Sequence, residues 1–170
     1  SIAALNGYLM DMNFYHYGGW LQATDGSWPH GYITGSGQPM RFVAADGSIL
    51  PVYQQLTPLV DEQMVAGDAL EQLTAGQAIS VSQQVIDASL SGDYAALVAQ
   101  LHVDYYYPDG GQTWGEGTID YAKAVGVPVW SADEWLAFTK MRDGAQLAGI
   151  SWDSALKRPS FTLTTAGSPG

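Results

Sequence analysis

The sequence predicts an α/β fold, with a mostly parallel sheet, covering helices and a C-terminal β-hairpin. Two observations lead to this prediction. Segments with apolar residues at every second position alternate along the chain with segments of helical periodicity, and two strand-like segments, 147–152 and 160–165, follow each other near the end. The 170 residues, 46% of them hydrophobic, can bury a proper core. We expect an α/β domain over 1–145, followed by the hairpin and a tail over 146–170.

The first half of the chain predicts a strand, a hairpin and two helices. The strand covers the alternating segment 8–17. A hairpin is expected next, because Asp46-Gly47 is a pair that tight turns favour. A helix should begin at Thr57, with a proline in its first turn, and run to about residue 70. The second helix begins at Thr74, where the residues match a capping box.

The second half continues this alternation. We expect a strand over 101–106, a helix over 118–124 and a short buried strand over 127–130. A second capping box, beginning at Ser131, predicts the last helix before the C-terminal hairpin. This order of strands and helices favours a parallel sheet covered by helices.

Charge and composition exclude several classes of partner. The formal net charge is −11, with six Lys and Arg against 17 Asp and Glu, so the chain cannot neutralise a nucleic-acid backbone or an anionic membrane surface. No apolar run reaches the length of a membrane-spanning helix, so we expect no membrane insertion. Low charge with many aromatic and small polar residues is typical of exported proteins, which favours a secreted or cell-surface location. The start at Ser1 suggests a piece of a larger polypeptide.

Two predicted strands carry the candidate site residues. Asp11 and Asn13 share one face of the first strand, and His102 and Asp104 share one face of the strand over 101–106. In parallel sheets ligands bind at the carboxyl ends of strands, so these faces are expected to meet at one opening. The alternative is structural, since the same side chains can hydrogen-bond to neighbouring strands. Asp61, on the expected helix, is typical of a solvated face.

Five segments of the chain resemble a known group of proteins. They are similar to the later part of the barrel region in large secreted bacterial proteins of the polysaccharide deacetylase/glycoside hydrolase-like (β/α)-barrel type: 11–18, 30–37, 52–57, 101–106 and 126–136. The resemblance implies a partial (β/α) barrel and a carbohydrate-directed hydrolase. Deacetylases of that superfamily bind a divalent metal with an Asp and two His, but this chain lacks their Asp-Asp and His-x-x-x-His motifs. No cofactor is therefore certain, and a divalent metal stays an open alternative.

The expected function is hydrolysis of a glycosidic or acyl bond in a polysaccharide or oligosaccharide. Asp104 is the expected acid–base residue, with His102 as its partner and Asp11 as the second carboxylate. If the bond is an acyl bond, a metal-bound water held by Asp and His would act instead of the two carboxylates. Asn13 would position the substrate, and three aromatic residues would line the groove: Tyr15, Tyr106 and Trp130. The alternative is a non-catalytic glycan-binding or cell-surface assembly module that uses the same aromatic residues.

Overall fold

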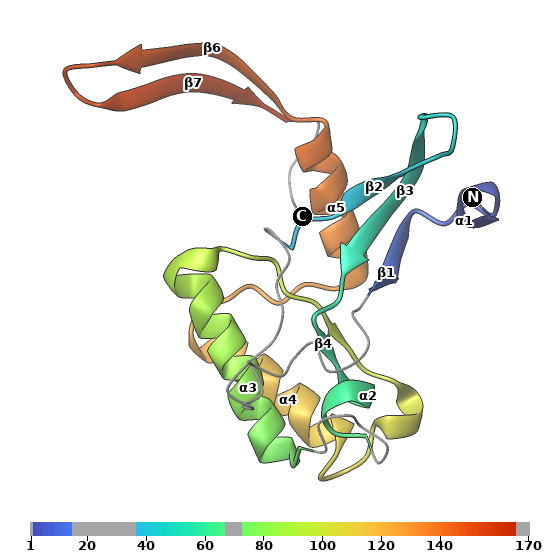
Figure 1. The fold of residues 1–170 in the computed structure, drawn as a ribbon. Coiled ribbons are helices and arrows are strands. Elements are labelled where there is room, and N and C mark those ends of the chain that lie inside the picture. The colour runs from blue at the N-terminus through green and yellow to red at the C-terminus, as the bar shows by residue number, and fades with distance from the viewer. Residues whose placement is uncertain (1, 15–36, 67–72, 166–170) are drawn as a thin grey trace. The chain divides into compact units, whose positions relative to one another are not determined.

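The computed structural model describes residues 2–14, 37–66 and 73–165 (Figure 1). The chain divides into two units, Ser1–Val129 and Trp130–Gly170, and each is described by itself. The division predicted from the sequence, after residue 145, stays a prediction. The fold mixes helices and strands as expected. In the described ranges, however, the sheets are small and none closes into a barrel.

A three-stranded sheet lies in the first unit, after the short helix α1 (Ile2–Leu5). Its strands are β1 (Met10–Phe14), β2 (Met40–Val43) and β3 (Ile49–Leu56), in the order β1-β3-β2. β1 is parallel to β3, whereas β2 and β3 form the expected antiparallel hairpin. Gly47 turns this hairpin with φ +85°, and Asp46 Oδ1 accepts a hydrogen bond from the backbone N–H of Ser48. The predicted hairpin turn at Asp46-Gly47 is therefore confirmed.

The helix expected from Thr57 begins later and is much shorter. Leu59–Val60 form the strand β4, which pairs in parallel with β5 (Ala99–Gln100). Helix α2 then covers only Asp61–Met64. Both side chains of β4 are buried, and a short apolar pair that is buried on both faces suits a parallel strand better than one stripe of a helix.

The prediction of a strand over 101–106 is wrong. β5 ends at Gln100, and a 3₁₀-helix, η3 (Val103–Tyr105), follows. The amide of Tyr105 donates to the carbonyl of His102, so the backbone turns here instead of joining a ladder. Val103, which would lie on the opposite face of that strand from His102 and Asp104, is 89% exposed. The alternation of residue types therefore did not reflect a sheet.

Two helices cover the second strand pair. α3 (Ala75–Ala88) begins at the predicted capping box of Thr74, and after the π-turn η2 (Ser89–Asp93) the chain returns to β5. α4 (Gly111–Ala124) begins seven residues before the predicted helix. Trp114 of α4 is fully buried, and its indole Nε1 donates to Ser82 Oγ of α3 at 2.9 Å. The core around it comprises Leu59, Met64, Val65, Ala78 and Trp114.

The second unit holds a helix and the C-terminal hairpin. α5 (Ala132–Asp143) begins at the predicted capping box of Ser131, while the strand expected over 127–130 does not form. β6 (Gln146–Asp153) and β7 (Arg158–Thr164) pair antiparallel, as predicted. Leu147 lies opposite Leu163 in this ladder, and every residue of both strands is exposed.

Gly37 is a position in the first unit where no side chain fits. Its φ is +64°, and an added Cβ would lie 2.2 Å from the carbonyl oxygen of Ala96. We expect Gly37→Ala to lower the free energy of unfolding by about 3 kcal/mol, because backbone strain and a clash with main chain add together. Gly47→Ala is the matched control: φ is +85° in open space, so only about 1 kcal/mol is expected. Urea unfolding of both variants measures the difference, and equal losses would contradict the expected clash.

Candidate functional site

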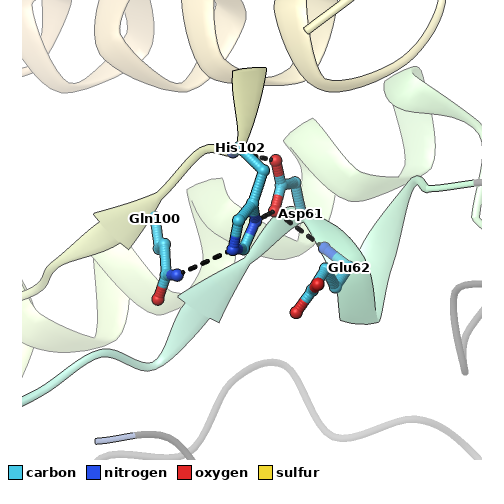
Figure 2. Close-up of polar contacts among 4 residues, drawn as sticks. All are labelled: Asp61, Glu62, Gln100 and His102. Atoms are coloured by element: carbon cyan, nitrogen blue, oxygen red, sulfur yellow. Dashed lines mark hydrogen bonds and ion pairs between the residues drawn. The ribbon is translucent and has the colours of Figure 1, made fainter. Parts of the chain in front are cut away.

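A buried carboxylate joins the ends of β4 and β5. Asp61 follows β4 directly and is fully buried. Its Oδ2 accepts the backbone N–H of His102 at 2.6 Å, and its Oδ1 lies 2.7 Å from His102 Nδ1 (Figure 2). Oδ1 also accepts the backbone N–H of Glu62 at 2.9 Å. The parallel pairing of Val60 with Gln100 brings the two strand ends together and so places this contact.

His102 is held at both ring nitrogens. Nδ1 faces the Asp61 carboxylate, and Nε2 lies 3.0 Å from the side-chain Nε2 of Gln100 (Figure 2). An amide N–H can donate only to a nitrogen with a lone pair, so this geometry corresponds to the neutral imidazole that carries its proton on Nδ1. The side chain of His102 is 33% exposed, whereas that of Asp61 is inaccessible to solvent. The ring is therefore accessible while its carboxylate partner is not.

The surroundings raise the pKa of His102 above its ordinary value of 6.5. The largest cause is the hydrogen bond to Asp61, which favours the protonated ring. The negative charges of Asp61, Glu62 and Asp104 act in the same direction, and partial burial opposes them. This combination of an oriented imidazole and a buried carboxylate is suited to proton transfer.

An open cleft of about 520 Å³ lies beside this pair. It is lined by Met12 and Asn13 of β1 and by the segment from Val98 to His102. The hydroxyl of Thr57, at the end of β3, donates to the carbonyl of Met12 and fixes this end of β1. The cleft thus lies beside β1 and along β5, two strands that belong to different small sheets.

The structure brings together only some of the predicted site residues. His102 and Asn13 line the cleft, but Asp11 and Asp104 are not among its described lining residues. Asp104 is exposed on η3, and Asp11 Oδ1 accepts the backbone N–H of Asn13 at 3.0 Å. The pairing of Asp104 with His102 on one strand face is therefore wrong, because no strand forms there.

The three predicted aromatic groove residues fall in different parts of the chain. Tyr106 is exposed, and its hydroxyl donates to Glu116 of α4 at 3.2 Å. Trp130 belongs to the second unit, where it packs against Trp135 and Phe138 with ring centroids 6.1 and 5.3 Å away. Tyr15 lies outside the described residues. A groove shared by these three residues therefore stays a prediction.

Sequence reasoning missed two residues of the site, Asp61 and Gln100. The prediction that Asp61 lies on a solvated helix face is wrong, because it ends a buried strand and accepts three hydrogen bonds. The apolar pair Leu59-Val60 between Pro58 and an acidic residue was the available signal, since it is typical of a short buried strand with a carboxylate at its end.

The described residues hold neither a cluster of metal-binding side chains nor a helix suited to span a membrane. Among residues 2–14, 37–66 and 73–165, no three His, Asp or Glu side chains lie close enough together to hold a metal ion. None of the helices in the same ranges has the length and apolar character needed to cross a membrane.

Comparison with protein-family models, with curated proteins and with solved structures finds no match for this chain. The resemblance to secreted polysaccharide-directed barrel proteins stays a prediction.

Proposed function

We propose that this chain is a carbohydrate-directed hydrolase domain that cleaves an acyl bond on a polysaccharide, with His102 as the general base. The observation that carries the proposal is the buried Asp61 carboxylate bonded to His102 Nδ1 beside an open cleft. A carboxylate in this position orients the ring and stabilises the imidazolium that forms during proton transfer. The strand pairs β1-β3 and β4-β5 are both parallel, as is usual in α/β proteins.

The lining of the cleft favours an acyl bond over a glycosidic bond. Glycoside hydrolysis generally uses two carboxylates on either side of the scissile bond. None of the described lining residues is acidic, and Asp61 lies behind the imidazole, fully buried. One oriented imidazole instead suits activation of a water molecule that attacks a carbonyl carbon.

The proposed reaction uses one proton-transfer group in two roles. His102 Nε2 takes a proton from water while the water oxygen bonds to the carbonyl carbon and the carbonyl π electrons move to its oxygen. The tetrahedral intermediate then re-forms the carbonyl and breaks the bond to the sugar oxygen or nitrogen, which takes the proton from the imidazolium. The products are a carboxylic acid and a free sugar hydroxyl or amine. Asn13, at the same cleft, offers a carboxamide that can donate to the substrate carbonyl.

The proposal is tested with acetylated polysaccharides as substrates. His102→Gln is expected to lower kcat at least about 100-fold, because the general base is lost, with a smaller change in KM. Wild-type kcat should rise with pH through the His102 pKa, above 6.5, since only the neutral ring accepts a proton. Released acetate measures turnover, and Asp120→Asn, an exposed change on α4, is the control. If Asp104→Asn abolishes turnover and His102→Gln does not, the assignment of His102 is wrong.

A glycan-binding module is the second candidate, and one cluster favours it. Trp130 is 44% exposed and is backed by the rings of Trp135 and Phe138 in the second unit. An exposed indole supported in this way can stack on a sugar ring. A binding module would lose retention on a polysaccharide gel when Trp130 is replaced by alanine and would keep it in His102→Gln. The hydrolase proposal requires turnover, which binding alone does not provide.

A further inference from the structure

The side chain of Gln100 leaves one polar atom unused. Its Nε2 contacts His102 Nε2 at 3.0 Å, while its Oε1 is buried and has no hydrogen-bond partner within the described part of the chain. An unpaired buried acceptor carries a cost of about 1–3 kcal/mol. A change in the protonation of His102 explains this unpaired atom, because a protonated ring offers a donor at Nε2.

We propose that Gln100 is a positioning residue whose carboxamide makes a half turn whenever His102 gains or loses its proton at Nε2. The exchange of the two amide atoms keeps the ring held in both states. The coupling itself depends on the observed contacts. Its catalytic meaning rests on the proposed function, in which a water must replace the amide at Nε2 before His102 takes a proton, so Gln100 holds the ring only while no substrate is bound.

The two states differ in which amide atom faces the ring. In the neutral state, Nδ1–H donates to Asp61, and the Nε2 lone pair accepts an N–H from Gln100. In the protonated state both ring nitrogens are donors, so the amide N–H would oppose a ring N–H. A half turn places Oε1 at Nε2, and it gives the unpaired acceptor a charged donor. The oxygen and nitrogen ends of a carboxamide are similar in size, so the packing changes little.

The carboxylates around the ring favour its protonated form. Three carboxylates act on His102: Asp61 and Glu62 from α2, and Asp104 from η3. The residues that β1 contributes to the cleft, Met12 and Asn13, are uncharged. Together with the hydrogen bond to Asp61, these charges raise the pKa of His102 above its ordinary value of 6.5. A substrate water reaches Nε2 only when it replaces the Gln100 amide there.

The test is an NMR titration of the full ¹⁵N-labelled chain over roughly pH 5–9, where histidine changes charge. The imidazole nitrogens of His102 and the side-chain NH₂ signals of Gln100 are followed together. We expect one common midpoint, and above it the tautomer protonated on Nδ1. If the Gln100 NH₂ signals do not change while His102 titrates, the inference is overturned.

Two variants test the half turn against a fixed amide. Gln100→Met has similar length but neither donor nor acceptor, so the His102 pKa should stay within about half a unit of wild type, because the wild-type amide serves both forms. A fixed amide that donates in both states would instead make the pKa in Gln100→Met about one unit higher than wild type, and this outcome contradicts the proposal. Gln100→Glu supplies only acceptors and should raise the pKa by about one unit, a tenfold tighter hold on the proton.

The outcomes separate this inference from the proposed function. If the titrations are coupled as expected but no acylated polysaccharide is hydrolysed, the hydrolase proposal fails and the Gln100 coupling stands. If hydrolysis depends on His102 but the Gln100 signals do not follow its titration, the hydrolase proposal stands and the Gln100 coupling fails. Should either variant fail to fold, the wild-type titration decides by itself.

Discussion

Asp61→Ala is expected to destabilise the first unit by about 3 kcal/mol and to remove the raised pKa of His102. The change leaves the backbone N–H groups of Glu62 and His102 and the ring Nδ1–H without their common acceptor. An unpaired polar group that is shielded from water carries most of its desolvation cost. Asp61→Asn keeps the size and one acceptor oxygen, so roughly half of that loss is expected.

The loss of unfolding free energy in Asp61→Ala should depend on pH, because the pKa of His102 differs between the folded and unfolded states. The hydrogen bond to Asp61 raises the pKa of His102 in the folded protein above 6.5. The resulting stabilisation is fully present below pH 6.5 and is lost as the pH rises through the folded pKa. The variant should therefore lose more stability near about pH 6 than near about pH 9.

Urea unfolding at both pH values, together with an NMR titration of His102, measures these effects. Asp120→Ala, on the exposed side of α4, is the control and should change stability by less than about 0.5 kcal/mol. Equal losses at the two pH values, or an unchanged His102 pKa, would show that Asp61 does not hold the imidazolium.

Trp114→Ala is expected to lower the free energy of unfolding by about 3–5 kcal/mol. Trp114 is fully buried in the core with Leu59, Met64 and Ala78, and its loss leaves a cavity between α3 and α4. Ser82 Oγ also loses the indole N–H that it accepts. Since Leu59 belongs to β4, the strand that precedes Asp61, a loosened core should also disturb the contact between Asp61 and His102.

Trp152→Ala is the matched control for Trp114→Ala. The indole of Trp152 is 63% exposed on the hairpin, so its removal should cost less than about 0.5 kcal/mol. Circular dichroism during urea unfolding measures both variants. Similar losses in the two would contradict the burial of Trp114 in a core that stabilises the first unit.

Elements with local signals were predicted well from the sequence. The turn at Asp46-Gly47 and the capping boxes of Thr74 and Ser131 form as expected, because each depends on hydrogen bonds among residues at most four positions apart. The C-terminal hairpin also forms. The alternation of apolar and polar residues predicts this hairpin, because two segments of similar length follow each other across a short turn.

Elements that depend on distant partners were predicted wrongly. The region after Thr57 forms the short strand β4 and helix α2 instead of a long helix. The region over 101–106 follows β5 and turns into η3 instead of forming a strand. Each of these strands has only two residues, too few for a periodic pattern to appear in the sequence. The choice between helix and strand there was made by burial against α3 and α4, which the local residues do not specify.

By itself, the sequence determined the acidic charge, the mixed α/β class, the two hairpins and the two capped helix starts, since composition and short-range hydrogen bonding need no knowledge of the fold. It also singled out His102 and Asn13, which line the cleft. Only the tertiary structure decided the partner of His102. Asp61 lies 41 positions away in the chain and reaches the imidazole because β4 and β5 pair in parallel, and no spacing pattern in the sequence encodes that pairing.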